Sequence, residues 1–561
     1  MNFINNIFNT NKRNINKYKK RVSEINKLIE QNKGFSDEEI LSIFNTSDSE
    51  EKRLALSCIM SKRKLGLEPF DVQKIGTLAL LDGKISEMKT GEGKSLVAAL
   101  AATCCLEKSV FIVTTNDYLA KRDAIEMKPL FDSLQVSFSS LQEGEPQENK
   151  KDIYNNKIVY GTNSAFAFDF LYSHMVYSIE DKIQPEQNFA IVDECDSVLI
   201  DEAKTPLIIS GENSIEENFY QKTFDICKKL ITEEDFEINL KQKSALFTEE
   251  GYEKLESFYD KKKGELFTQE NSHILNQCNQ NIIALHIYNK EVDYIVENNE
   301  VKIIDEFSGR IQEGRRFGNG LHQSLEVKEG IEPNAESSTI AETSYQSYFG
   351  LFNRLSGMSG TAQSEATEFF EIYGLDTITI PTNKPVIRND IEDKIFPDEK
   401  SKLKYLINFV LEEQEKNKTP FLIGTISVEQ SILIVKAFKD LGIDRVEVLN
   451  AKNHFKESEI IANAGQPNSI TISTNMAGRG VDIKINPDVK KHGLFVIGFE
   501  RYQNRRIDNQ LIGRSGRQGD PGSSIYLLSL EDNILRISDD DKESKVMNYL
   551  KKTLQGEEEG I

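Results

Sequence analysis

The sequence predicts an α/β protein with two parallel sheets and a separate α+β block inserted between strands of the first sheet. Two observations support this prediction. Short apolar, β-branched runs alternate with helical stretches from Val110 onwards, and continuous apolar strands of this kind are typical of parallel sheets covered on both faces. These runs form two series, separated by a region of different character. A chain of 561 residues is also too long for a single hydrophobic core.

Each series defines where strands are expected. The first contains the runs VFIVTT, IVYG and FAIVD, at residues 110–115, 158–161 and 189–193. The second contains FLIGT, VEVLN, ITIST, LFVIG and IYLLSL, at residues 421–425, 446–450, 470–474, 494–498 and 525–530. Because helical stretches lie between the runs, we expect strand–helix–strand units in both sheets.

The region between the two series has the pattern of antiparallel hairpins. Alternating residues at 293–307 flank a polar Glu-Asn-Asn-Glu turn, and residues 237–248 contain a similar pair. We interpret this region as an α+β domain inserted into the first α/β domain. The expected limits are 1–211 and 344–385 for the first α/β domain, 212–343 for the insertion, 386–536 for the second α/β domain, and 537–561 for a charged, solvated tail.

The composition argues against several classes of protein. The formal charge of −21 disfavours non-specific nucleic-acid binding, because such binding needs a basic surface. The six cysteines form no CxxC pair and no histidine lies at zinc-finger spacing, so we expect no zinc site and a reducing compartment. No apolar run approaches the ~20 residues of a membrane-spanning helix, and the N-terminus lacks the residue order of a signal peptide.

The stretch MKTGEGKSL is the strongest functional signal in the chain. Its glycines, Gly91 and Gly93 on either side of Glu92, allow backbone N–H groups to approach a phosphate closely. Lys94 would reach the β- and γ-phosphates of a nucleotide, and Ser95 would bind Mg²⁺. An apolar helix is expected to begin here, so that its positive end faces the same anion. The alternative is a glycine-rich turn without a ligand.

Two further signals fit a nucleotide site. Asp193 and Glu194 stand at the tip of the run FAIVD, as in a Walker B element. Asp193 would bind Mg²⁺, largely through water, and Glu194 would orient and deprotonate the attacking water. Ahead of the glycine-rich loop, Gln73 offers an amide that can hydrogen-bond to both a donor and an acceptor on adenine. Taken alone, a glutamine such as Gln73 is more often a surface residue.

The second α/β domain supplies cations. Gln510, Arg514 and Arg517 follow the pattern Q-x-x-G-R-x-G-R on one short segment. Two guanidinium groups facing a γ-phosphate would neutralise the charge that develops during phosphoryl transfer. Asp482, at another strand end, is placed to meet the ribose or polyphosphate side of the nucleotide. The stretch GMSGTA, residues 357–362, is interpreted as a small-residue turn suited to relaying loss of the γ-phosphate between domains.

With these motifs in this order, the chain resembles helicase-type motors, and more narrowly the SecA family. SecA proteins are the ATPases that drive preproteins through the SecY channel. The resemblance covers residues 66–536 and includes EMKTGEGKS, TTNDYLAKRD, VDECDSVLIDEAKTPLIISG, DEFSGRIQEGRRFGNGLHQSLEVKEG, TNMAGRGVDI and ERYQNRRIDNQLIGRSGRQGDPGSS. It implies two tandem RecA-like P-loop motor domains, with an α+β preprotein-binding domain inserted in the first.

The resemblance also implies a site and partners. ATP and Mg²⁺ would bind between the two domains, at the residues singled out above. The implied partners are an unfolded preprotein, the SecY channel complex and an anionic membrane surface, with a homodimer as one assembly and no nucleic acid. The implied location is cytoplasmic and peripheral on the inner face of the cell membrane. A second acidic pair, Asp201 and Glu202, lies where the insertion leaves the motor, so we interpret it as a hinge feature.

The chain departs from the family pattern in its length. Family members continue into a helical scaffold, a helical wing and often a metal-binding tail, all of which we expect to be absent here. Two alternatives to a translocase motor stay open. One is a two-lobe nucleic-acid helicase, which the acidic composition and the insertion disfavour. The other is a motor fragment that binds ATP or SecY without translocating, which the missing scaffold favours.

Overall fold

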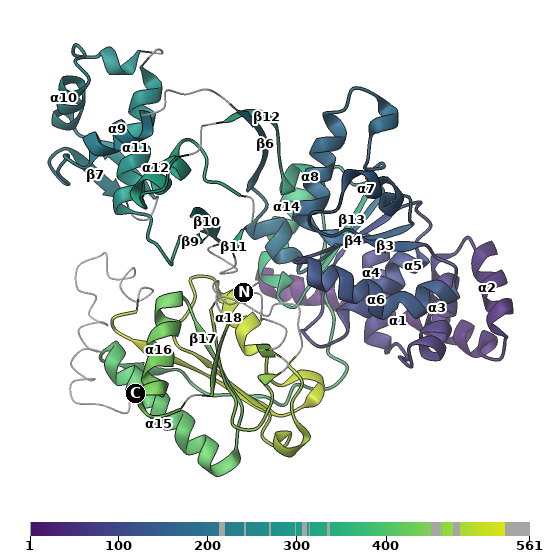
Figure 1. Ribbon diagram of the computed structural model, residues 1–561. Coiled ribbons are helices and arrows are strands. Elements are labelled where there is room, and N and C mark those ends of the chain that lie inside the picture. Colours follow the sequence, from purple (N-terminus) through teal and green to yellow (C-terminus); the bar gives the residue numbers. More distant parts are fainter. Residues whose placement is uncertain are drawn as a thin grey trace.

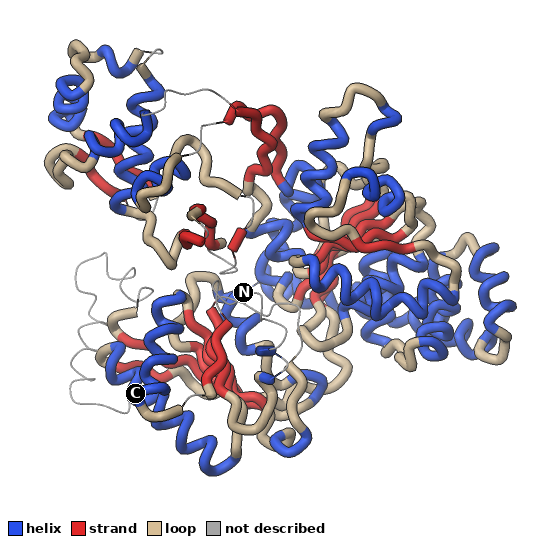
Figure 2. Tube along the Cα trace, in the orientation of Figure 1, coloured by secondary structure: helices blue, strands red, loops and turns tan. Residues whose placement is uncertain are grey.

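The computed structural model has three parts (Figure 1). A first α/β lobe carries the N-terminal helices, a second α/β lobe carries the later strands, and an α+β block is joined to the first lobe by a two-stranded ribbon (Figure 2). The structure describes residues 2–212, 219–239, 243–268, 271–297, 299–305, 311–312, 315–333, 337–443, 445–449, 460–461, 463–474 and 483–532. The expected charged tail, residues 537–561, lies outside these ranges.

The first lobe is built on a seven-stranded parallel sheet with the order β14-β1-β13-β5-β2-β4-β3. The three apolar runs expected here are β2, β4 and β5, and the chain returns to this sheet after the inserted block to form β13 and β14. The strands are β1 (Ile85–Glu87), β2 (Val110–Thr114), β3 (Phe138–Ser140), β4 (Ile158–Thr162), β5 (Phe189–Asp193), β13 (Arg354–Ser359) and β14 (Thr377–Thr379).

Helices cover both faces of this sheet, which explains why its strands are apolar throughout. Val110 and Ile112 of β2 belong to one core, and Phe111 and Val113 belong to the other. The first core is completed by α1 (Asn2–Asn32), α2 (Asp37–Thr46), α3 (Glu50–Lys64), α4 (Asp71–Leu81), α5 (Lys94–Cys104) and α6 (Asp117–Ser133). The second is completed by α7 (Gln147–Tyr154), α8 (Asn163–His174), α13 (Tyr345–Phe349) and α14 (Ala366–Tyr373).

The inserted block leaves and re-enters the first lobe through an antiparallel ribbon. β6 (Pro206–Glu212) pairs with β12 (Ser337–Ser344), so both crossings run side by side. Both predicted hairpins are confirmed, as the pairs β7–β8 and β9–β10. The block consists of α9 (Phe219–Cys227), β7 (Phe236–Asn239), β8 (Ser244–Phe247), α10 (Glu249–Phe258), α11 (Ser272–His286), β9 (Tyr294–Glu297), β10 (Glu300–Ile304), β11 (Ile311–Gln312) and α12 (Leu321–Lys328), around a core of its own.

The second lobe carries a second parallel sheet, with the order β15-β21-β20-β17-β19-β18 and β16 beside β21. All five apolar runs of the second series are strands of this sheet. Its elements are β15 (Asn389–Asp390), β16 (Lys394–Phe396), α15 (Glu399–Asn417), β17 (Phe421–Thr425), α16 (Val428–Asp440), β18 (Val446–Leu449), β19 (Ile470–Thr474), β20 (Leu494–Gly498), α18 (Arg505–Ile512) and β21 (Gly522–Ser529). Over the described residues, none of the helices has both the length and the apolar character needed to span a bilayer.

Candidate functional site

The glycine-rich loop joins β1 to α5 in a conformation that depends on two glycines. Gly91 and Gly93 have φ angles of 87° and 82°, in a left-handed region that other residues adopt only at a cost. Gly93 is the N-cap of α5, and a Cβ atom there would collide with Nε2 of Gln73. The loop therefore turns at the positive end of a buried helix, where backbone N–H groups can bind a phosphate.

Gln73 holds this loop from α4. Its Nε2 atom donates to the carbonyl of Glu92 at 2.9 Å, and its Oε1 atom accepts from the backbone N–H of Phe70 at 2.9 Å. Glu92 is itself buried, and its carboxylate accepts from the backbone N–H of Asn383 at 3.0 Å. Both polar atoms of the Gln73 amide thus bind protein backbone in this structure, and its contact with adenine stays a prediction.

Lys94 lies against the two carboxylates at the end of β5. Its Nζ atom is 2.7 Å from Oε1 of Glu194 and 3.7 Å from Oδ1 of Asp193. Burial alone would lower the pKa of Lys94, but the charges of Glu194 and Asp193 outweigh burial and raise this pKa. The loop lysine and the acidic pair, which are far apart in the sequence, therefore form one cluster, in which Lys94 and Glu194 are buried and Asp193 is partly buried.

Ser95 and the carboxylates of this cluster offer two of the kinds of donor that a magnesium ion uses beside a phosphate. Burial raises the pKa of Asp193 to about 6, the positive charge of Lys94 opposes this rise, and the negative charge of Glu194 adds to it. P-loop proteins bind Mg²⁺ through one hydroxyl, one carboxylate, phosphate oxygens and water. Ser95 and Asp193 fit the first two roles. In the part of the chain that the structure describes, no set of three or more His, Cys, Asp or Glu side chains could hold a metal ion by itself.

Two details of the cluster were missed by sequence reasoning. Glu194 has a φ angle of 50°, which is strained for a residue other than glycine. Ser95 donates its hydroxyl proton to Oδ2 of Asp123 on α6 at 2.9 Å. Asp123 lies in the stretch TTNDYLAKRD, which is part of the family resemblance, but nothing in its spacing indicates a contact with Ser95.

The segment after α18 reaches the glycine-rich loop from the second lobe. A Cβ atom on Gly91 would lie 3.2 Å from Cδ of Arg517, and Nε2 of Gln518 donates to the carbonyl of Gly91. Arg514, in the same turn, is buried and lines a small cavity of the second lobe. The structure therefore brings Arg517 onto the loop and places Arg514 inside the second lobe. Asp482 lies outside the described residues.

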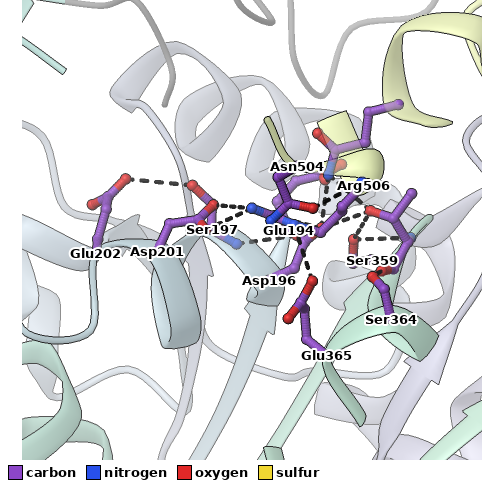
Figure 3. A network of polar contacts seen from close by, with 12 residues as sticks. Glu194, Asp196, Ser197, Asp201, Glu202, Ser359, Ser364, Glu365, Asn504 and Arg506 are labelled. Atoms are coloured by element: carbon purple, nitrogen blue, oxygen red, sulfur yellow. Dashed lines mark hydrogen bonds and ion pairs between the residues drawn. The ribbon is translucent and has the colours of Figure 1, made fainter. Parts of the chain in front are cut away.

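A second polar cluster joins the two lobes through Arg506 on α18 (Figure 3). Its side chain is 1% exposed and lies among three carboxylates of the first lobe. Nη1 is 3.0 Å from Oδ2 of Asp196, Nη2 is 2.5 Å from Oδ1 of Asp201, and Nε is 3.8 Å from Oε1 of Glu365. Asp201 ends a π-helical turn just before the ribbon, so the second acidic pair begins at the interface between the lobes.

Asp196 connects two of the sequence motifs. Thr361 and Gln510 each donate to Oδ2 of Asp196 at 2.7 Å, and Gln510 also donates to the hydroxyl of Thr361 at 2.8 Å. Thr361 belongs to GMSGTA, and the expectation of a turn over residues 357–362 is wrong for its first half. Residues 357–359 continue β13, because they pair with β1 in the middle of the sheet.

Replacing Arg506 by alanine is expected to weaken the contact between the lobes. The change leaves the buried carboxylate of Asp196 and the partly buried carboxylates of Asp201 and Glu365 without their guanidinium partner, and removing one member of a buried ion pair costs about 3–5 kcal/mol. Amide hydrogen exchange should become faster in residues 196–203 and 505–512. Arg505, the exposed neighbour of Arg506 on the same helix, gives a matched control. The variant Arg505→Ala should show the same amide hydrogen exchange as the unchanged protein. Equal exchange in both variants would contradict a role for Arg506 at the interface.

Comparisons with known proteins match both lobes. A family model described as the SecA DEAD-like domain matches residues 4–370, and one described as the SecA P-loop domain matches residues 385–492 and 486–555. The protein translocase subunit SecA of a Nitratiruptor species is 47% identical over 564 aligned residues, covering 98% of this chain and 65% of that protein. The proteins of the same name from Sulfurimonas denitrificans and Helicobacter pylori are 46% and 47% identical, each covering 96% of this chain and 64% of the relative.

This chain therefore spans 64–65% of the length of these curated relatives. Among solved structures, S. cerevisiae Dbp5 bound to RNA and ADP BeF3 is 14% identical, with a TM-score of 0.44, and the match covers 89% of this chain and 97% of that chain.

Proposed function

The chain belongs to the SecA family, and from that premise we propose that it is an ATP-driven motor that moves unfolded preproteins through the SecY channel. One observation carries the proposal. Arg517 of the second lobe contacts the glycine-rich loop of the first, and that loop leads into Lys94, which lies against Asp193 and Glu194. Phosphoryl transfer to water requires a glycine-rich loop with a lysine, an acidic pair and an arginine from a second lobe.

Nucleotide binding begins with an exchange of partners at Lys94. Glu194 holds the Lys94 ammonium at 2.7 Å, so the β- and γ-phosphates must replace this carboxylate. Backbone N–H groups of the glycine-rich loop complete the phosphate site. Ser95 and, through water, Asp193 would hold Mg²⁺, whose charge offsets that of the phosphates. The exchange releases Glu194 from Lys94 and makes its carboxylate available for catalysis.

Hydrolysis then needs a base and positive charge. Glu194 orients the attacking water and accepts its proton. Arg514 and Arg517 offset the charge that develops on the γ-phosphate during transfer, Arg514 after a movement of its segment towards the loop. Asp482 contacts the ribose or polyphosphate side of the nucleotide, and Gln73 contacts adenine.

The contacts between the lobes can couple this reaction to the inserted block. Asp196, Thr361 and Gln510 connect the acidic segment, the small-residue motif and the second lobe. Asp201 binds Arg506 shortly before β6 begins, and the N–H of Gln346, just after β12, donates to the carbonyl of Ala203 at 2.9 Å. Movement of one lobe against the other is therefore expected to move the ribbon and the block attached to it.

The inserted block is the proposed preprotein-binding domain. An extended chain can add to an open strand edge through main-chain hydrogen bonds, with little dependence on its own side chains. Among the described residues, β9 is the outer strand of a three-stranded antiparallel sheet in the block, and it offers such an edge beyond Tyr294, whose carbonyl already accepts from the backbone N–H of Glu291. The limits 212–343 for this domain, and 1–211, 344–385 and 386–536 for the motor domains, belong to the same proposal.

The proposed partners and location follow from the family. They are the SecY channel complex and an anionic membrane surface, with the protein in the cytoplasm and peripheral on the inner face of the cell membrane. A homodimer is compatible with this proposal. The formal charge of −21 does not favour a nucleic-acid partner.

The rate of ATP turnover tests this function. With membrane vesicles that carry SecY, an unfolded preprotein should raise phosphate release above the basal rate of the protein. Stimulation by RNA, without a response to preprotein, would favour a helicase instead. A basal rate that neither preprotein nor RNA changes would favour a motor fragment that binds ATP or SecY without translocating.

A further inference from the structure

The hydrogen bond between Ser95 and Asp123 assigns a role to a residue outside the predicted site. Ser95 donates to Oδ2 of Asp123 at 2.9 Å, and Asp123 is only 5% exposed. We infer that Asp123 is a positioning residue, which accepts the hydroxyl proton of Ser95 and so turns the free lone pairs of that oxygen towards Mg²⁺. The inference rests on the proposed function, because it gives Ser95 the role of a magnesium ligand.

The chemistry of the hydroxyl group explains why Ser95 needs this partner. A serine hydroxyl has one proton and two lone pairs, and a metal ion is bound by a lone pair. The proton must therefore point away from the ion and towards an acceptor. Groups that accept a hydrogen bond from a metal ligand fix its orientation, and their loss typically lowers metal affinity by about 10–100-fold. Asp123 is the acceptor that the structure provides for Ser95.

Asp123 is held in a fixed orientation by its own neighbour. Nε and Nη2 of Arg122 donate to Oδ1 of Asp123 at 2.8 and 2.6 Å. The two carboxylate oxygens therefore have separate partners, Arg122 on Oδ1 and Ser95 on Oδ2. Both residues belong to α6, whose inner face is packed into the first core. The carboxylate is thus anchored on a rigid helix rather than on a loop.

The variant Asp123→Asn tests the inference at nearly constant shape. Its amide oxygen would be attracted to the two donors of Arg122, so that its NH₂ group would face Ser95 and occupy a lone pair of the hydroxyl. Titration calorimetry with ADP, once with Mg²⁺ and once with EDTA, gives the increase in ADP affinity that Mg²⁺ produces. We expect Asp123→Asn to reduce this increase by about 10–100-fold and to leave the affinity in EDTA unchanged.

Further variants separate orientation of Ser95 from a general effect on folding. Asp132→Asn, an exposed carboxylate on the same helix, should leave both affinities unchanged. Asp123→Ala should lose as much of the magnesium effect as Asp123→Asn. Adding Asp123→Asn to Ser95→Ala should not further reduce the increase in ADP affinity that Mg²⁺ produces, because the hydroxyl that Asp123 orients is already absent.

The outcomes distinguish the inference from the proposed function. The inference would be overturned, while the proposed function stands, if Mg²⁺ raised ADP affinity as much in Asp123→Asn and Asp123→Ala as in the unchanged protein. It would also be overturned if the losses caused by Asp123→Asn and Ser95→Ala added fully in the double variant. Loss of ADP affinity in EDTA equal to the loss in Mg²⁺ would also overturn it, since the role would then be structural. No ADP binding by the unchanged protein would overturn the proposed function and the inference together.

Discussion

Replacing Glu194 by glutamine is expected to lower kcat for ATP hydrolysis by about 10²–10⁴-fold while ATP still binds. Glutamine has nearly the same shape, but it cannot accept the proton of the attacking water. The carboxylate also competes with the phosphates for Lys94, because the two side chains are 2.7 Å apart. Removing its charge should therefore leave the Kd for ATP unchanged or lower it. Phosphate release measures kcat, and equilibrium titration with ATP measures Kd.

A matched variant shows whether the effect is specific to Glu194. Glu368 is an exposed glutamate on α14 of the same lobe, and Glu368→Gln should keep kcat and Kd near those of the unchanged protein. A Glu194→Gln protein that hydrolyses ATP at the normal rate would remove Glu194 from the role of base. A protein that neither binds nor hydrolyses ATP would instead assign Glu194 to the structure of the loop.

Replacing Arg517 by alanine is expected to lower kcat by about 10³–10⁵-fold. The guanidinium opposes charge that develops mainly in the transition state, so the Kd for ATP should change much less than kcat. The structure supports this expectation, because the side chain of Arg517 extends from the second lobe to Gly91 in the glycine-rich loop. Steady-state hydrolysis and equilibrium titration together separate the two quantities.

The control for Arg517 comes from the same lobe. Arg505 is exposed on α18, and Arg505→Ala removes the same charge without changing the contact with the loop. It should hydrolyse ATP at the normal rate. Equal losses of kcat and ATP affinity in Arg517→Ala would show that Arg517 contributes to ground-state binding rather than to the transition state.

Local patterns predicted the strands and the glycine-rich loop of the two lobes well. The apolar runs became buried strands of parallel sheets, because a strand covered on both faces has no polar side to interrupt its sequence. Gly91 and Gly93 adopt the left-handed conformation that their place in the loop requires. Lys94 and the pair Asp193–Glu194 meet because the loop after β1 and the end of β5 lie at the same carboxyl edge of one parallel sheet, where only β13 separates the two strands.

The contacts between distant segments could not be predicted in the same way. Arg506 and Asp201 are 305 positions apart, and each looks like a surface charge when its own segment is considered alone. The contact of Asp123 with Ser95 depends on how α6 packs beside α5, which no local pattern specifies. The small residues of GMSGTA suggested a turn, whereas half of them are needed as a strand in the crowded middle of the sheet.

The central claim is that the triphosphate is bound between the lobes, with Arg517 acting on the phosphate that Lys94 holds. The most direct test compares the affinity for ADP–fluoroaluminate, which is a transition-state analogue, with the affinity for ADP. Calorimetry gives the ratio of these two affinities in the unchanged protein and in Arg517→Ala. We predict that this ratio falls by at least about 10²-fold in Arg517→Ala while ADP affinity changes little. A ratio that is the same in both proteins would contradict the claim that the second lobe takes part in the reaction.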